Sequence, residues 1–184
     1  MGRLPDAPLE VRLAATLFLL LLGLANLFGA WQVRNFASFT PRGVAETVAP
    51  EGREHTVHDA HRAMGERPVD LADLDHSRHR IDRQLLVQDS HVHIPLYAIT
   101  AALLSAILFG LRLSSRRRVA LVLLLFAAPF LDFAGLWGAH LGEAPLFWGS
   151  VAVAGGFAMG AAYLIVMAMT LSQCWFRRRE KQDA

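Results

Sequence analysis

Histidines gather in one part of this sequence. Seven of the eight lie between residues 55 and 93, and the eighth is His140. Imidazole nitrogens bind transition metals and haem iron, and the unperturbed side chain titrates near neutral pH. The sequence therefore offers three kinds of chemistry here: metal binding, haem binding and a response to pH.

The pattern His91-Val92-His93 is the best candidate for a pair of metal ligands. Because Pro95 disfavours helical angles just before it, we expect the preceding residues to be extended. Side chains two positions apart in an extended segment point to the same side. Both imidazoles would then face one divalent transition metal, with His140 as the third ligand. The carboxylates that could complete the site are Asp89 and Glu143.

The same histidines suit a second cofactor, a haem b with His93 and His140 as its axial ligands. Haem-binding bundles usually bury their histidines within helices, whereas these two stand at the ends of predicted helices. In a third interpretation the imidazoles are structural and bond to loop carbonyls and lipid headgroups. The residues leave all three interpretations open.

Five more histidines occur at helical spacing in the preceding segment. They are His55, His58, His61, His76 and His79. Histidines three positions apart share a helix face, where they could bind a metal or respond to pH. Their spacing matches no standard zinc signature, so a solvated helix surface is the competing interpretation.

Four long apolar runs must position these residues. Apolar residues make up 54% of the 184-residue chain, and a membrane-spanning helix needs about 20 consecutive, mostly apolar residues. The runs cover residues 11–31, 94–113, 119–140 and 145–175. Trp31, Trp137, Trp148 and Trp175 lie near their ends, as interfacial anchors do. We predict an all-α integral membrane protein, a bundle of four transmembrane helices.

The basic residues predict the orientation. Arginines fill the link at 112–118 and follow the last run at 177–179, whereas the link at 141–144 has no Lys or Arg. Positive residues mark cytoplasmic loops, so we expect both termini in the cytoplasm, with the protein in a bacterial inner membrane. The expected parts are the cytoplasmic N-terminus and first helix (1–31), a periplasmic loop (32–93), the remaining helices (94–175) and a basic cytoplasmic tail (176–184).

The loop at 32–93 is too long for a simple connection. Thr40-Pro41 is typical of a helix start, with Thr40 as the N-cap and Pro41 as the first helical residue. Segments 53–65 and 70–88 carry residues at helical spacing. We therefore predict a helical periplasmic cap over the mouth of the bundle.

Asp132 is an acidic residue inside the third apolar run. It lies roughly 20 Å along a helix from Arg118, which places it well inside the hydrocarbon region. A carboxylate at that depth is costly, so it should face the bundle interior or bind something. Tyr97, Thr100 and Asn26 should lie near its depth. The candidate roles are a hydrogen-bonded structural acid, a proton relay, a quinone-headgroup contact or an ion pair with a partner subunit.

The last run contains several glycines, including the pair Gly156-x-x-x-Gly160. Such a pair lets another helix approach closely. Pro129 should kink the preceding helix and free a backbone carbonyl. The glycines predict close packing, within the bundle or against another subunit.

The order of motifs resembles a group of small uncharacterised bacterial four-helix inner-membrane proteins. The resemblance rests on Phe39-Thr40-Pro41, the long outer loop, His91-Val92-His93 entering the second helix, and Leu131-Asp132 in the third. It extends over most of the chain. It implies the four-helix layout and brings no activity and no catalytic residues.

Several function classes lack their signatures in the sequence. The single cysteine, Cys174, excludes an intrachain disulfide and a CxxCH haem site. The chain has no Walker motif, HExxH or Gly-x-Ser-x-Gly, so we do not expect an independent enzyme. The basic residues form no single patch, so nucleic-acid binding is not expected.

The first hypothesis is a small membrane subunit of a larger, electron-transferring complex, with a divalent transition metal or haem b as its candidate cofactor. Its expected partners are the lipid bilayer and other membrane or periplasmic subunits. The alternative is a purely structural or assembly protein whose outer cap docks a periplasmic partner. A third hypothesis is a sensor of metal or pH.

Overall fold

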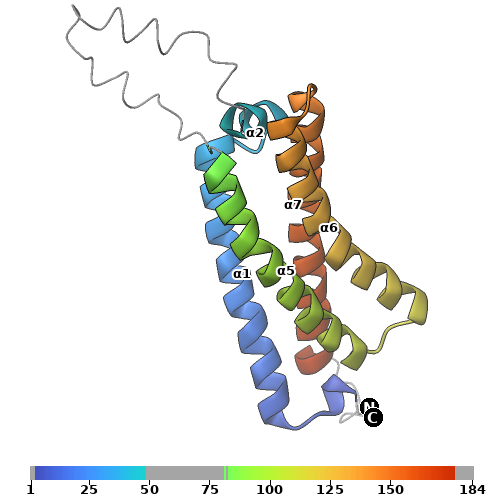
Figure 1. Cartoon of the computed structure of the whole chain (residues 1–184). Helices are drawn as coiled ribbons and strands as arrows, with labels where there is room; N and C mark the ends of the chain where they lie inside the picture. Colours follow the sequence, from blue (N-terminus) through green and yellow to red (C-terminus); the bar gives the residue numbers. More distant parts are fainter. Residues whose placement is uncertain (1–2, 49–80, 82, 177–184) are drawn as a thin grey trace, which may run out of the picture.

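The computed structural model describes residues 3–48, 81 and 83–176, and this part of the chain is helical without strands (Figure 1). Four of its helices are long and apolar enough to cross a membrane. They are α1 (Leu9–Ala37), α5 (Arg83–Gly110), α6 (Ser115–Leu141) and α7 (Pro145–Leu171). The predicted fold class, an all-α membrane bundle with four spanning helices, is confirmed.

Three short elements complete the described chain. The 3-10 turn η1 (Leu4–Asp6) precedes α1, the helix α2 (Pro41–Val48) follows it, and the π-helical turn η3 (Ser172–Phe176) extends α7. The elements η1 and η3 are in contact at one end of the bundle (Figure 1), which we call the terminal end. The opposite end carries α2 and the link from α6 to α7, and we call it the α2 end.

Helix α2 begins as its sequence predicts. The backbone N–H of Gly43 donates to Oγ1 of Thr40 at 2.9 Å, which confirms Thr40 as the N-cap. Ser38 and Phe39 both have φ of 52°, so the chain turns sharply between α1 and α2. Ile81 lies beside the end of α2, because its N–H donates to the Thr47 carbonyl at 2.8 Å. The predicted helix at 53–65 lies outside the described residues.

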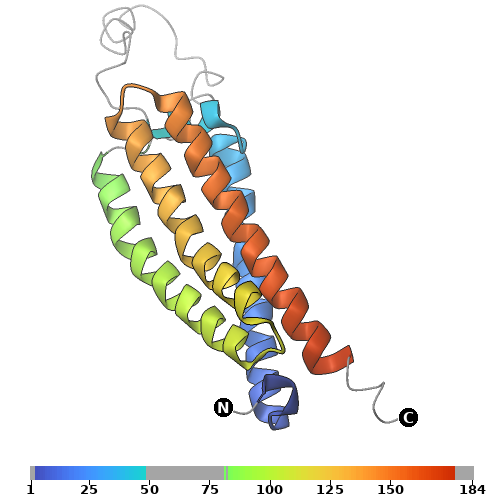
Figure 2. The same cartoon turned by 90° about the vertical axis from the view of Figure 1, so that its right-hand side faces the viewer.

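Helices α6 and α7 form the closest helix pair, and Figure 2 shows α5, α6 and α7 side by side with α1 behind them. Small residues make the α6–α7 approach possible. A Cβ added to Gly135 of α6 would overlap the backbone of Ala152, and one added to Gly155 of α7 would lie 2.9 Å from Cα of Asp132. The tight glycine contact is therefore made by Gly155 rather than by Gly156 or Gly160.

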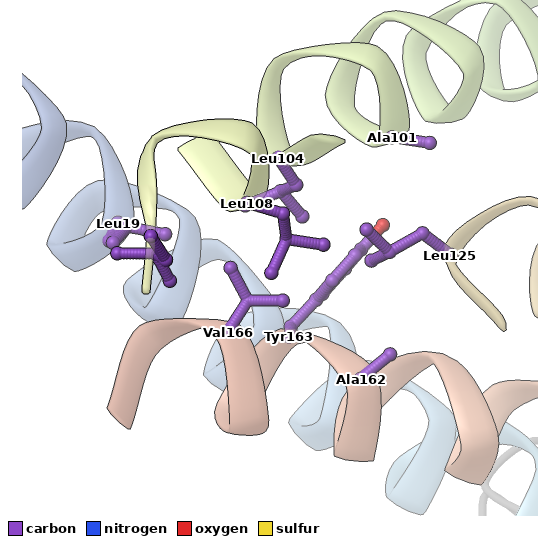
Figure 3. Close-up of a cluster of buried hydrophobic side chains, with 9 residues drawn as sticks. Leu19, Ala101, Leu104, Leu108, Leu125, Ala162, Tyr163 and Val166 are labelled. Carbon is purple, nitrogen blue, oxygen red and sulfur yellow. The ribbon is translucent and has the colours of Figure 1, made fainter. Parts of the chain in front are cut away.

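A cluster of buried apolar side chains joins the helices in the terminal half of the bundle (Figure 3). Leu104 and Leu108 of α5 meet Val166 and Tyr163 of α7, and Leu19 of α1 joins them. Each of the three leucines is at most 2% exposed. This cluster is the main attachment of α1 to the other spanning helices.

The other half of α1 stands apart from the bundle. In the most apolar stretch of α1, 6% of the residues are buried. The corresponding share is 28% in each of the other three spanning helices. Helix α1 packs mainly against α2 and α7, and its residues 27–35 are all exposed. In a bilayer, apolar surface of this kind faces lipid or another helix at little cost.

The expectation of an extended segment before Pro95 is wrong. Residues 83–94 are helical, and α5 continues through Pro95. Proline removes one backbone donor, so the carbonyl of His91 loses its helical partner, but spanning helices tolerate such a loss. Helix α1 also extends beyond residue 31, the predicted end of the first run, to Ala37.

Candidate functional site

A contact between His93 and Asp89 lies on the first turns of α5, at the α2 end. Nδ1 of His93 lies 3.0 Å from Oδ1 of Asp89 and 3.0 Å from the backbone oxygen of the same residue. The two side chains are about two-fifths exposed, so solvent or headgroups reach them. The helix places them four residues apart on one face, where such pairs meet.

Tyr97 continues this face of α5 one turn further into the bundle. Its ring lies 5.9 Å from the ring of His93 and 5.8 Å from the ring of Phe133 on α6. Asp132 lies close enough to interact electrostatically with Tyr97, His93 and Asp89. The structure thus brings together Asp132, Tyr97 and the His93–Asp89 pair at the interface of α5 and α6.

The other two residues predicted near Asp132 have different surroundings. Asn26 of α1 donates its amide to the carbonyl of Leu22 at 2.8 Å, within its own helix. Thr100 is buried on α5. Among the described residues neither makes a hydrogen bond to Asp132. Of the three residues predicted near Asp132, Tyr97 is therefore the one that interacts with it electrostatically.

The carboxyl group of Asp132 makes no hydrogen bond within the described part of the chain. Its side chain is partly exposed. Its backbone packs against Gly155, and its Oδ1 lies 3.8 Å from the position of a Cβ on Gly156. Asp132 therefore sits at the edge of the α6–α7 contact, with its oxygen beside the Gly156 face.

His140 connects α6 to α2. Its side chain is buried, and its Nδ1 lies 2.8 Å from the carbonyl oxygen of Val48. A carbonyl accepts, so Nδ1 carries the proton, and in the neutral ring Nε2 keeps its lone pair. The neighbouring Trp137 donates from Nε1 to Oγ of Ser90 at 2.8 Å, which joins α6 to α5.

The predicted ligand set is only partly assembled. His91 is exposed, and it points away from His93 because helical residues two apart diverge by about 200°. Among the described residues no group of three or more His, Cys, Asp or Glu could hold a metal ion. The Trp137–Ser90 hydrogen bond closes the α5–α6 interface near His93 and His140. Metal and haem binding stay predictions, and His55, His58, His61, His76 and His79 lie outside the described residues.

We expect His140→Ala to loosen α2 from the bundle. The substitution removes a buried hydrogen bond and leaves the Val48 carbonyl without its donor, which costs about 1–3 kcal/mol. Thermal unfolding of the purified chain in detergent measures the loss, with the exposed His91→Ala as the matched control. Equal unfolding temperatures for the two variants would show that the Val48 contact contributes nothing.

Arginines at the terminal end make contacts that reasoning from the sequence did not predict. Arg12 is 6% exposed, and its guanidinium donates to the carbonyl of Cys174 at 2.7 Å. Its Cζ lies 4.4 Å from the ring centre of Trp175, whose Nε1 donates to Oγ1 of Thr16 at 3.1 Å. The C-terminal carbonyls of a helix carry partial negative charge, so the cation stabilises the end of α7 and ties α1 to it.

Two more arginines connect the segments at this end. Nη2 of Arg112 donates to both carboxylate oxygens of Asp6, at 2.9 and 3.1 Å. The backbone N–H of Arg112 donates to Oε1 of Gln173. Arg118 donates to the carbonyls of Leu111 and Leu113. The arginines that the sequence marks as orientation signals thus also bind η1, the α5–α6 link and η3 together.

An open cavity of about 480 Å³ lies beside the free part of α1. Its lining mixes apolar, aromatic and polar side chains. They are Ala30, Trp31, Arg34, Asn35 and Phe39. The ring of Phe39 lies 5.9 Å from that of Phe157, so one wall of the cavity is in contact with α7.

Comparison with known proteins supports the fold. A family model described as a transmembrane helical domain matches residues 71–181, a region that includes α5, α6 and α7. No curated protein and no solved structure matches the chain. The match covers more than half of the sequence, and the chain therefore belongs to the Aq_1264_TM family of transmembrane helical domains.

Proposed function

We propose that the protein is a small integral membrane subunit that packs laterally into a larger membrane complex. The observation that carries this proposal is the isolation of α1 over residues 27–35, all of which are exposed. Helices associate in a bilayer through side-chain packing and hydrogen bonds. The exposed half of α1 does not pack against the other spanning helices in this way. The other half is held in the apolar cluster.

The surroundings of the free half support this role. The cavity beside it places Arg34 and Asn35 next to Trp31 and Phe39. Aromatic and polar groups of this kind are suited to contact a neighbouring subunit near a membrane surface. We further propose that the α2 end faces the periplasm of a bacterial inner membrane, because the arginine-rich α5–α6 link belongs on the cytoplasmic side.

Extraction of the full chain from its native membrane in mild detergent tests the proposal. We expect the chain to migrate with other subunits, and Gly29→Leu to reduce their recovery. No atom lies within 4 Å of a Cβ on Gly29, so the isolated chain should still fold. Ala14→Leu, at an exposed site in the attached half of α1, is the matched control. A chain that runs alone as a monomer contradicts the proposal.

Electron transfer with a bound metal or haem is the second candidate function. The observation that favours it is that His93 and His140 both have Nδ1 beside an oxygen acceptor, which leaves Nε2 as the nitrogen that would bind a ligand. We then expect a Soret band or a stoichiometric metal in the purified complex, lost in His93→Ala and His140→Ala. Absence of both signals would remove this candidate and leave the subunit role intact.

A further inference from the structure

Asp132 presents an unsatisfied carboxyl group within the membrane-spanning part of α6. Its side chain is partly exposed and makes no hydrogen bond within the described residues. Ionisable groups at such depth are costly, and they usually pair with another group or line a functional path. The described part of the chain does not complete the environment of this carboxyl group.

The titratable groups of α5 near Asp132 make no ion pair with it in the described structure. Asp89 is a second acidic residue, and Nδ1 of His93 is already in contact with Asp89 at 3.0 Å. Tyr97 lies within electrostatic range, and no hydrogen bond joins it to Asp132 in the described structure. Among the described residues, no Lys or Arg pairs with this carboxyl group.

The surface beside Asp132 leaves room for such a partner. Oδ1 of Asp132 is the nearest neighbour of a Cβ on Gly156, and a Cβ on Gly160 would meet no atom within 4 Å. The two glycines are one helical turn apart, so they share a face of α7. The two glycines have no side chains of their own, so another helix can approach closely at these positions.

A second copy of this chain does not supply the missing charge. Residues 13–33, 84–111 and 119–176 include the apolar parts of all four spanning helices, and none of them is Lys or Arg. The partner must therefore be a different membrane protein. Its helix must carry a basic side chain at the depth of Asp132.

We propose that Asp132, Gly156 and Gly160 form a docking surface for one transmembrane helix of a different protein, which carries a Lys or Arg that pairs with Asp132. This inference rests on the proposed role as a subunit and names the chemistry of the partner. The helix packs on the two glycines, and its cation satisfies the carboxylate. Arginine would additionally allow a bidentate pair.

Paired variants of the full chain, expressed in the native membrane, test this surface. Removing one member of a desolvated charge pair costs about 2–5 kcal/mol, so Asp132→Asn should lower partner recovery more than about tenfold. Gly160→Leu should do the same by steric exclusion. The controls are Glu143→Gln, which removes an acid outside the spanning helices, and Ala154→Leu, which adds the same bulk at an exposed site of α7. Both controls should retain the partner.

Unfolding temperatures of the purified variants separate docking from folding, since Asp132→Asn and Gly160→Leu should unfold as the wild type does. Full recovery of the partner with both variants would overturn the docking surface while leaving the subunit role standing. Loss of partner with the two controls as well would also overturn it.

Crosslinking identifies the occupant directly. Cysteine introduced at Gly160, in a chain with Cys174→Ser, is coupled to a photoreactive probe, and the captured peptide is sequenced by mass spectrometry. We expect a transmembrane segment of another protein that contains Lys or Arg. Capture of lipid alone, of a second copy of this chain, or of a segment without a basic residue contradicts the proposal.

Discussion

Replacing Gly155 by leucine is expected to separate α6 from α7 and to cause a large loss of stability. A Cβ at this position would lie 2.9 Å from both the Ala128 carbonyl oxygen and Cα of Asp132. Backbone atoms cannot move aside as a flexible side chain can. Overpacking alone costs about 1–3 kcal/mol, and separation of the helices adds the lost contacts, so we expect at least about 3 kcal/mol. Thermal unfolding in detergent measures the loss.

Gly160→Leu in the isolated chain is the matched control for this prediction. It adds the same side chain to the same helix, but no atom lies within 4 Å of the new Cβ. We expect its unfolding temperature to stay within a few degrees of the wild type. If both leucine variants lost the same stability, the effect would come from helix composition rather than from the α6–α7 contact.

Arg12→Ala should produce the second large effect, the release of α1 from the end of α7. The substitution removes a charged hydrogen bond to the Cys174 carbonyl, worth about 1.5–3 kcal/mol, and the stacking on Trp175, worth about 0.5–2 kcal/mol. Relief of the desolvation of a buried cation offsets part of this loss. We therefore expect a net loss of about 2 kcal/mol in unfolding free energy.

Cys174 reports this release directly, because it is the only cysteine and is 0% exposed. Its labelling by a maleimide should be slow in the wild type and clearly faster in Arg12→Ala. Arg116→Ala, which removes an exposed arginine at the same end, should leave both the labelling rate and the unfolding temperature unchanged. Unchanged labelling in Arg12→Ala would show that Arg12 does not hold this end closed.

Features that depend on local patterns were predictable from the sequence. The four apolar runs predict the spanning helices, because burial of backbone polar groups in lipid requires long continuous helices. Thr40 before Pro41 predicts the start of α2, since capping depends on a few adjacent residues. The depth of Asp132 followed from the constant rise of a helix. In each case the information lies within one segment.

Tertiary structure decided how the segments meet. Gly155 faces the backbone of α6 while Gly160 faces open space, and the sequence cannot distinguish them because the rotation of α7 depends on what it packs against. Arg12 looks like an ordinary flanking charge until α1 meets the end of α7.

The histidines illustrate the same division. Their concentration between residues 55 and 93 is visible in the sequence, but the course of α5 through Pro95 turns His91 away from His93. His140 is directed to the Val48 carbonyl of a segment far from it in the chain. By itself the sequence determined the four spanning helices and the acid among them. Contacts between distant segments decided which of these side chains are satisfied, because a partner's position depends on packing rather than on spacing.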